Sequence, residues 1–341
     1  MKNILITGGA GYIGTHLALD LIDSGFRPIL IDNFSNSSIL SINLINKLAS
    51  GEFDFLKGDL LDKGFLDGLF NKYNFDAVIH LAAHKSVSES LYFPLKYYRN
   101  NLEGFVNLLN CMESANLKRI VFSSSASIYE QISDSGLKET DLKNPISPYA
   151  KTKYFAEEIL SDFHFSTKIN FISLRYFNPV GAHSSLEIGE IPNKETTNLM
   201  PILCMAATGK RDLFYIYGND YNTPDGTCIR DFIHITDLTS AHLAALFYLL
   251  ENPEVNLKLN IGTGKGISVL GLVQHFEKVN NCKINVKFEK RRDGDVAACF
   301  ADPALSISQL KWKAKKDISQ MCFDSYNWQV KLNKITRSYV D

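Results

Sequence analysis

The sequence predicts an α/β fold in which a doubly wound parallel sheet is followed by a smaller C-terminal α+β domain. Two observations support this fold class. Short segments rich in Val, Ile, Leu and Phe alternate with longer helical patterns through the first half of the chain, an alternation typical of parallel strands joined by helices. Polar or glycine residues also follow almost every expected strand.

The expected elements of the first half follow from these patterns. Six strands are expected, each a short apolar run: Asn3–Thr7, Pro28–Ile31, Phe53–Lys57, Ala77–His80, Ile120–Ser123 and Asn170–Arg175. The helical patterns between them include Tyr12–Ser24 and Leu95–Ala115. Pro94 is a favourable first residue for the second of these helices, because its missing N–H would have no partner there.

The second half of the chain is richer in turn residues, including those of the polar segment 181–198. We therefore expect one domain over residues 1–178 and another over residues 179–341. A helix around Ala241–Leu250 and a strand at Lys258–Ile261 are expected to bring residues 230–262 back to the main sheet.

Charge and composition exclude several classes of protein. The 341 residues include 36 Lys and Arg against 37 Asp and Glu, so a nucleic-acid or membrane-surface partner has no electrostatic support. No run approaches the roughly 18 apolar residues of a membrane-spanning helix, and no signal peptide is visible. The six cysteines are scattered, which predicts no metal site, reduced thiols and a cytoplasmic protein.

The polar residues that follow the strands predict where a ligand binds. In an open parallel sheet, ligands bind beyond the carboxyl ends of the strands. The residues that follow successive strands are Gly8, Asp32, Asp59, His80–Ala83, Ser123–Ser125 and Phe177–Asn178. Their repeated position predicts a site along this one edge of the sheet.

The segment Thr7–Gly14 (TGGAGYIG) has the pattern of a dinucleotide-binding Rossmann turn. Gly8 permits the tight turn, Gly11 lets the backbone approach a pyrophosphate, and Gly14 lets the helix pack closely on the strand. Free N–H groups at the helix N-terminus then face the phosphates. Asp32 ends the next strand, where its carboxylate accepts from both ribose hydroxyls and repels a 2′-phosphate. The sequence therefore predicts NAD rather than NADP.

A tyrosine base is the predicted catalytic group. Tyr149 and Lys153 lie one turn apart on a helix that begins near Ser147. A free tyrosine titrates near about 10 and is a poor base, but the Lys153 ammonium and the positive nicotinamide ring of NAD would favour the phenolate. Ser125, at the end of the preceding strand, could donate a hydrogen bond to the reacting oxygen.

These motifs resemble the extended short-chain dehydrogenases, and within them the UDP-glucose 4-epimerase family along almost the whole chain. The segments that carry the resemblance are TGGAGYIG, the Ser125–Tyr149–Lys153 set, RYFNPVGAH at Arg175–His183, NLMP at Asn198–Pro201, GNDYNTPDGTCIRDFIHI from Gly218, and RRDGD from Arg291. The resemblance implies an NAD-dependent UDP-hexose 4-epimerase, which interconverts UDP-glucose and UDP-galactose.

The resemblance also implies a mechanism. Tyr149 would remove the proton of the 4-hydroxyl while the C4 hydride passes to NAD, giving bound NADH and a transient 4-keto sugar. That sugar would turn over in the pocket and receive the hydride on its other face. The reaction requires a firmly held nucleotide and a loosely held sugar, and relatives are commonly homodimers. Helices Leu95–Ala115 and Pro148–Phe163 are the expected dimer contacts.

The resemblance assigns residues to the two ligands. The expected cofactor contacts are Gly8, Gly11, Tyr12, Ile13, Gly14, Asp32, Asn33, Asp59, Leu60, Leu81, Ala82, Ala83, Lys85, Asn100, Ser123, Tyr149, Lys153, Tyr176 and Phe177. The expected UDP-sugar contacts are Lys85, Ser125, Ser127, Tyr149, Asn178, Asn198, Leu199, Tyr215, Ile216, Tyr217, Arg230, Phe232, Arg292, Asp295 and Cys299. Arg230 and Arg292 suit a diphosphate, although surface ion pairs are an equal alternative. Asp59 is either an adenine contact or a simple turn residue.

Several residues depart from the family pattern. Phe232 replaces a tyrosine of many relatives, Glu130 a glycine, and His84 an apolar residue. Cys299 stands where relatives restricted to glucose and galactose carry a bulky tyrosine, so room for a C2 acetamido group is expected. UDP-GlcNAc and UDP-GalNAc are therefore predicted as a further substrate pair, unless Cys299 is only a small core residue.

Two rival functions remain open at this point. A nucleotide-sugar dehydratase or decarboxylase of the same fold needs acidic groups directly after the catalytic serine, where this chain has Ala126 and Ser127. A non-catalytic NAD-sensing protein has no use for the set Ser125, Tyr149 and Lys153. The sequence favours the epimerase over both.

Overall fold

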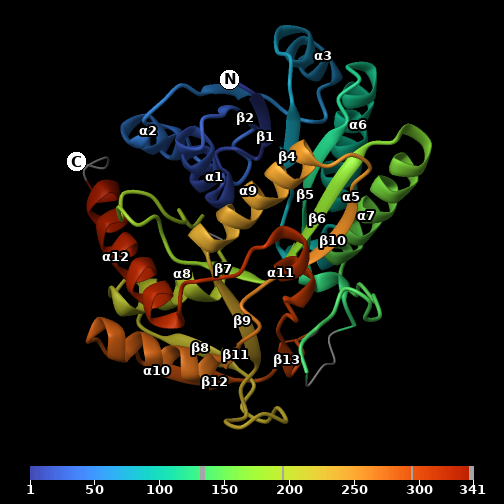
Figure 1. Cartoon of the computed structure of the whole chain (residues 1–341). Helices are drawn as coiled ribbons and strands as arrows, with labels where there is room; N and C mark the ends of the chain where they lie inside the picture. The colour runs from blue at the N-terminus through green and yellow to red at the C-terminus, as the bar shows by residue number, and fades with distance from the viewer. Residues whose placement is uncertain (131–134, 194–195, 293–294, 338–341) are drawn as a thin grey trace.

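A seven-stranded parallel sheet in the order β10-β6-β5-β4-β1-β2-β3 forms the main body of the protein (Figure 1). The computed structural model describes residues 1–130, 135–193, 196–292 and 295–337. The strands are β1 (Asn3–Thr7), β2 (Arg27–Asp32), β3 (Asp54–Lys57), β4 (Ala77–His80), β5 (Arg119–Ser125), β6 (Asn170–Tyr176) and β10 (Asn256–Ile261). The expected doubly wound α/β architecture is confirmed.

Helices cover both faces of this sheet. One face packs against α1 (Tyr12–Asp23), α2 (Ile39–Leu48) and α9 (Ile235–Glu251). The other face packs against α3 (Lys63–Lys72), α6 (Gly104–Ser114) and α7 (Pro148–Thr167). Strands that are buried on both faces require near-continuous apolar sequence, which explains why their short apolar runs were recognisable.

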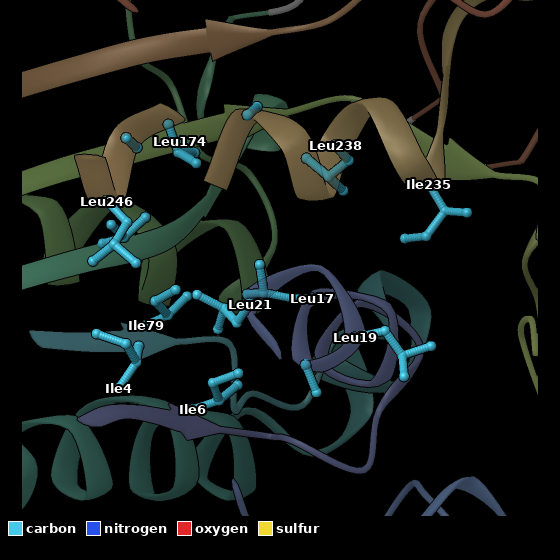
Figure 2. Packing of buried hydrophobic residues seen from close by; sticks show 14 of the residues in the cluster. Ile4, Ile6, Leu17, Leu19, Leu21, Ile79, Leu174, Ile235, Leu238 and Leu246 are labelled. Atoms are coloured by element: carbon cyan, nitrogen blue, oxygen red, sulfur yellow. The ribbon is translucent and has the colours of Figure 1, made fainter. Parts of the chain in front are cut away.

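Alternate side chains of a strand belong to the hydrophobic cores on opposite faces of the sheet. Ile4 and Ile6 of β1 point toward α1 and α9, where they meet Leu17 and Leu246 (Figure 2). Leu5, between them in the sequence, belongs to the core on the opposite face. This alternation fixes the register of β1, because a slip of one residue would exchange the two faces.

The strand order reverses between β1 and β4, which are neighbours in the sheet. Such a switch point is where open α/β sheets bind ligands. Gly8 follows β1 with a left-handed φ of 72°, and a Cβ atom at this position would lie 2.9 Å from the backbone nitrogen of Ala82, which follows β4. The glycine turn and the loop after β4 therefore meet at the switch point.

The prediction of one continuous helix over Leu95–Ala115 is wrong, because a π-helical turn interrupts it. The chain forms α5 (Pro94–Tyr98), a π-helical turn (Arg99–Glu103) and then α6, while α4 (Val87–Tyr92) precedes them. Pro94 lies in the first turn of α5, as expected. The periodicity of apolar residues does not reveal one residue inserted into a helix, and π-helical turns are frequent at functional sites.

A smaller lobe follows β6. One small sheet contains β7 (Asn178–Val180), β9 (Ile229–His234), β11 (Gly266–Ser268) and β13 (Ala298–Cys299), and a parallel pair is made by β8 (Phe214–Tyr217) and β12 (Val286–Glu289). Its helices are α8 (Leu199–Ala207), α10 (Val269–Asn280), α11 (Ala304–Leu310) and α12 (Ile318–Arg337). Within residues 230–262, α9 and β10 return to the main sheet, whereas β9 pairs with β7, β11 and β13. The division at residue 178 stays a prediction.

Two further features agree with the composition. All six cysteines are free thiols, and the cytoplasmic location inferred from their spacing stays a prediction. Among the described residues, no helix combines the length and the apolar character that crossing a membrane requires.

The packing of the glycine turn gives a test of the fold. In Gly14→Ala the new Cβ atom would lie 2.5 Å from the carbonyl oxygen of Gly8, so we expect the free energy of unfolding to fall by about 1–3 kcal/mol from overpacking. Gly68→Ala is the matched control, because Gly68 lies inside α3 with no atom within 4 Å of its Cβ position. This control should gain up to about 1 kcal/mol in denaturant unfolding. Equal stability of the two variants would contradict the packing.

Candidate active site

The N-terminus of α1 offers unpaired backbone donors beside the glycine turn. Gly11 caps the helix without any side-chain hydrogen bond to its first N–H groups. Those groups and the positive end of the helix dipole form an anion site. Tyr12 contributes its backbone there, because its hydroxyl donates to the carbonyl oxygen of Gly181 at 2.7 Å. The turn thus has the donors that a pyrophosphate needs.

Two carboxylates lie at the ends of β2 and β3. Asp32 accepts from the Ala10 N–H of the glycine turn at 3.1 Å and from the Ser37 hydroxyl at 2.7 Å. Asn33 donates its side-chain amide to Asp59 at 2.9 Å. The hydrogen bond from Ala10 therefore fixes the Asp32 side chain beside the glycine turn. Asp59 also accepts from the N–H of Leu61 at 2.9 Å, a contact that a turn residue makes.

The loop after β4 is tied to the π-helical turn and to α7. The side chain of Asn101 accepts from the His84 N–H at 2.8 Å and donates to the His84 carbonyl at 3.0 Å and to the Thr152 hydroxyl at 3.1 Å. Asn100, the expected contact, donates to Asn101 at 2.9 Å. The remaining apolar cofactor candidates, buried or half-buried, are Ile13, Leu60, Leu81, Ala82, Ala83 and Phe177.

Tyr149 and Ser125 lie beside each other at the carboxyl end of β5. Ser147 caps α7 by accepting from the Ala150 N–H at 3.1 Å, which places Tyr149 in the first turn. The Ser125 hydroxyl is near enough to Tyr149 to oppose the rise in its pKa. Ser127 donates its own hydroxyl to Ser125 at 3.0 Å.

Lys153 contacts the backbone of the serine segment at the end of β5. Lys153 is buried, and its ammonium donates to the Ser123 carbonyl oxygen at 2.7 Å. Burial lowers the pKa of Lys153 to about 7, against the opposing effect of Glu157. Burial also raises the pKa of Tyr149 above its usual value, and only the Ser125 hydrogen bond opposes that rise.

The protein groups alone therefore do not favour the Tyr149 phenolate. Lys153 is not among the groups that lower the pKa of Tyr149, and burial of the phenolate raises it. The expectation that Lys153 and the positive nicotinamide ring together favour the phenolate stays a prediction. Nearby, the hydroxyls of Tyr176 and Ser123 are hydrogen-bonded to each other.

Arg230 and Arg292 are held in two different ways in the smaller lobe. Arg230 donates to the carbonyl oxygens of Ile229 at 2.8 Å and Val296 at 2.9 Å, and it pairs with Asp295 at 3.3 Å. The guanidinium of Arg292 lies 3.7 Å from the ring centroid of Tyr217. Asp293, the adjacent carboxylate with which Arg292 could form a surface ion pair, lies outside the described residues.

The other expected sugar contacts divide by their side-chain direction. Tyr215 is exposed, whereas Ile216 and Phe232 are buried in the core of the smaller lobe and can offer only their backbones. Asn178 donates to the carbonyl oxygen of Asp231 at 2.8 Å. Cys299 is buried in one apolar cluster with Ala126 and Phe177, close to the serine turn.

Glu190 is a site residue that the sequence reasoning missed. Its carboxylate accepts from Asn198 at 2.8 Å, just before Leu199 begins α8, and from Lys85 at 3.4 Å. It thereby joins one expected contact from each lobe. Asn101 and Glu157 were missed as well. Two signals in the sequence could have found the last two residues: Asn101 adjoins Asn100, and Glu157 lies one helical turn after Lys153.

No group of three or more metal-binding side chains occurs among the described residues.

Comparisons with known proteins place these features in a family. The sequence family described as GDP-mannose 4,6 dehydratase matches residues 5–324. The UDP-glucose 4-epimerase of Bacillus subtilis (strain 168) is 44% identical over 327 residues, which cover 96% of each chain. The solved UDP-glucose-4-epimerase of Stenotrophomonas maltophila, with bound NAD and formylated UDP-arabinopyranose, superposes with a TM-score of 0.95 at 38% identity, covering 98% of this chain and 100% of that one. The UDP-Glc/GlcNAc 4-epimerase of Campylobacter jejuni has a TM-score of 0.83 at 36% identity, covering 97% of this chain and 100% of that one.

Proposed function

We propose, from the premise that this chain belongs to the UDP-glucose 4-epimerase family, that the hydroxyl pair of Tyr149 and Ser125 performs its proton transfer. The reaction is the NAD-dependent interconversion of UDP-glucose and UDP-galactose. The observation that carries the assignment of the base is the place of Tyr149 in the first turn of α7, beside Ser125 at the end of β5. It lies at the carboxyl edge of the sheet, where the glycine turn also opens.

The described residues fit NAD. A Cβ atom at Gly8 or Gly14 would clash with neighbouring backbone, so these glycines let the turn pack closely against the loop after β4 and against α1. The uncapped N-terminus of α1 would hold the pyrophosphate, and the Asp32 carboxylate would accept from the ribose hydroxyls. Bound NAD supplies the chemistry that side chains lack, which is the reversible acceptance of a hydride from C4.

The side chains around the sugar would move and hold one proton. Tyr149 takes the proton of the 4-hydroxyl, and the neighbouring Ser125 hydroxyl favours the phenolate by opposing the rise in its pKa. Ser127 orients Ser125 through the 3.0 Å contact. When the 4-keto sugar has turned over, the same tyrosine returns the proton to the 4-oxygen.

A dehydratase reaction is not favoured, although the matching sequence family is described by that activity. Elimination of water needs additional acid–base groups after the catalytic serine. Ala126 is a buried methyl group in the cluster with Cys299, and the Ser127 hydroxyl is engaged with Ser125. Neither position offers a carboxyl group.

We further propose that the enzyme accepts UDP-GlcNAc and UDP-GalNAc. Cys299 lies in one buried cluster with Ala126 and Phe177, and its side chain is much smaller than the tyrosine that relatives restricted to glucose and galactose carry. Burial raises the pKa of the Cys299 thiol to about 11, so the group is a neutral apolar neighbour. The Campylobacter jejuni relative, named for both UDP-Glc and UDP-GlcNAc, supports this proposal.

The homodimer is also a proposal, and it rests on exposed apolar side chains of the expected helices. Leu95 on α5 is 78% exposed, Phe155 on α7 is 42% exposed and Val106 on α6 is 40% exposed. α5 contacts α7 directly. Exposed apolar side chains mark a protein interface where they gather into one patch, and the proposal places that patch on α5, α6 and α7.

Removal of the Tyr149 hydroxyl tests the assigned base. We expect Tyr149→Phe to lower the turnover of UDP-galactose by about 10²–10⁴-fold, the usual contribution of a general base. NAD should remain bound, since the glycine turn is untouched. A coupled assay for UDP-glucose and release of NAD on denaturation measure both quantities. Turnover equal to that of the parent enzyme would remove Tyr149 from the mechanism.

The volume at position 299 tests the substrate range. Cys299→Tyr should lower kcat/KM for UDP-GalNAc by about 10–100-fold, as expected when an acetamido group no longer fits. The value for UDP-galactose should change by less than about 3-fold on the same argument. Cys299→Ser is the matched control and should keep both activities. Full activity of the tyrosine variant on UDP-GalNAc would contradict the proposal.

Charges on the exposed helices test the dimer. Leu95→Asp combined with Phe155→Asp should give a monomer in sedimentation equilibrium, because buried unpaired carboxylates oppose association. Phe323→Asp is the control, since Phe323 on α12 is similarly exposed at 44% but lies in the other lobe. A dimer that survives the double change would place the interface elsewhere.

A further inference from the structure

A buried ion pair lies directly beneath the catalytic groups. Glu157 is on α7, one turn after Lys153, and Arg175 is near the end of β6. The guanidinium donates to both carboxylate oxygens, at 2.9 and 2.6 Å. The Glu157 side chain is 0% exposed and that of Arg175 is 3% exposed. Such two-point contacts fix orientation as well as distance.

This ion pair connects to the reacting side chains through their sequence neighbours. Ser124 donates its hydroxyl to Glu157 at 2.5 Å. The residue before it, Ser123, supplies the carbonyl oxygen that binds Lys153. The residue after it, Ser125, has the hydroxyl that opposes the rise in the pKa of Tyr149. The position of the whole serine segment therefore depends on the carboxylate of Glu157.

The charge on Lys153 depends on Glu157 as well. Glu157 from α7 and His80 from β4 interact electrostatically with Lys153. Tyr149 lies one turn away on α7. On β6, Arg175 is paired with Glu157, and Tyr176 is hydrogen-bonded to Ser123, whose carbonyl oxygen binds Lys153. The pKa of His80 is lowered to about 3 and that of Tyr176 is raised by burial, so both are neutral. β5 contributes the Phe122 ring, 5.1 Å from the ammonium. Among these described groups, Glu157 is the one that carries a negative charge.

We propose that Glu157 is a positioning residue of the epimerase, whose carboxylate, fixed by Arg175 and Ser124, keeps Lys153 in its ammonium form against the Ser123 carbonyl. The proposal rests on the proposed function, since it assigns Lys153 a role beside Tyr149. Glu157 itself touches no reacting atom. Its effect is carried by the charge of Lys153 and by the placement of Ser123 to Ser125.

The sign of the effect follows from the charges. Burial lowers the pKa of Lys153 to about 7, and Glu157 opposes this. Without the carboxylate the pKa falls further, and the unbalanced Arg175 charge acts in the same direction. Lys153 then loses its proton at lower pH, so activity that needs the ammonium is lost earlier on the alkaline side.

Glu157→Gln in the holoenzyme tests the proposal by two readouts. Nitrogen-15 NMR of labelled lysine, with the Lys153 signal assigned by its loss in Lys153→Met, should show the titration of Lys153 moved down by about one pH unit or more. The alkaline limb of kcat for UDP-galactose should move by the same amount, while KM changes by less than about 3-fold because no substrate contact is removed. The NMR titration needs no turnover, so a failure of the epimerase assignment and a failure of this proposal give different results.

Two further variants separate positioning from stability. Glu157→Gln with Arg175→Met removes both charges, and it should recover the melting temperature. The Lys153 titration should stay below that of the parent enzyme, although it shifts less than in Glu157→Gln because the Arg175 charge is gone. Asp324→Asn removes another buried carboxylate, bonded to His234 at 3.0 Å in the smaller lobe, and it should lower stability without moving the titration. An unshifted Lys153 titration in Glu157→Gln, or its complete recovery in the double variant, would overturn the proposal.

Discussion

The ion pair of Glu157 and Arg175 joins the two strand ends and the helix on which the catalytic groups depend. Burying two charges is costly, and breaking such a pair typically destabilises a protein by about 3–5 kcal/mol. The pair is satisfied further by Ser124 and by the Tyr129 hydroxyl, to which Arg175 donates at 2.8 Å. These contacts therefore fix β5, β6 and α7 relative to one another before any ligand binds. The position of Tyr149 on α7 follows from this arrangement.

The proposed ligand contacts differ in kind between the two lobes. Arg230, the proposed diphosphate contact, is held by two carbonyl oxygens and by Asp295, so its guanidinium is preorganised. The proposed neighbours of the sugar are hydroxyls and the small thiol of Cys299. The sugar must present either face to the hydride. Such a sugar can be held by only a few fixed hydrogen bonds.

The sequence predicted the parts of this arrangement that depend on local patterns. β1 and β4 begin and end at the expected residues, because strands buried on both faces are short apolar runs. Tyr149 and Lys153 were found from helical spacing. The π-helical turn Arg99–Glu103 and the contact between Glu157 and Arg175 were not found, since neither an inserted helical residue nor a pairing between α7 and β6 leaves a periodic signal. The raised pKa of Tyr149 depends on burial, which spacing does not report.

The most direct test of the account is the fate of the hydrogen at C4 when UDP-galactose is converted in D2O. The side chains described here handle the hydroxyl proton, whereas the C4 hydrogen leaves as a hydride and returns within the closed site. Proton NMR of the product should therefore show UDP-glucose that retains its C4 protium. Deuterium at C4, or a product that has lost water, would contradict the proposed mechanism.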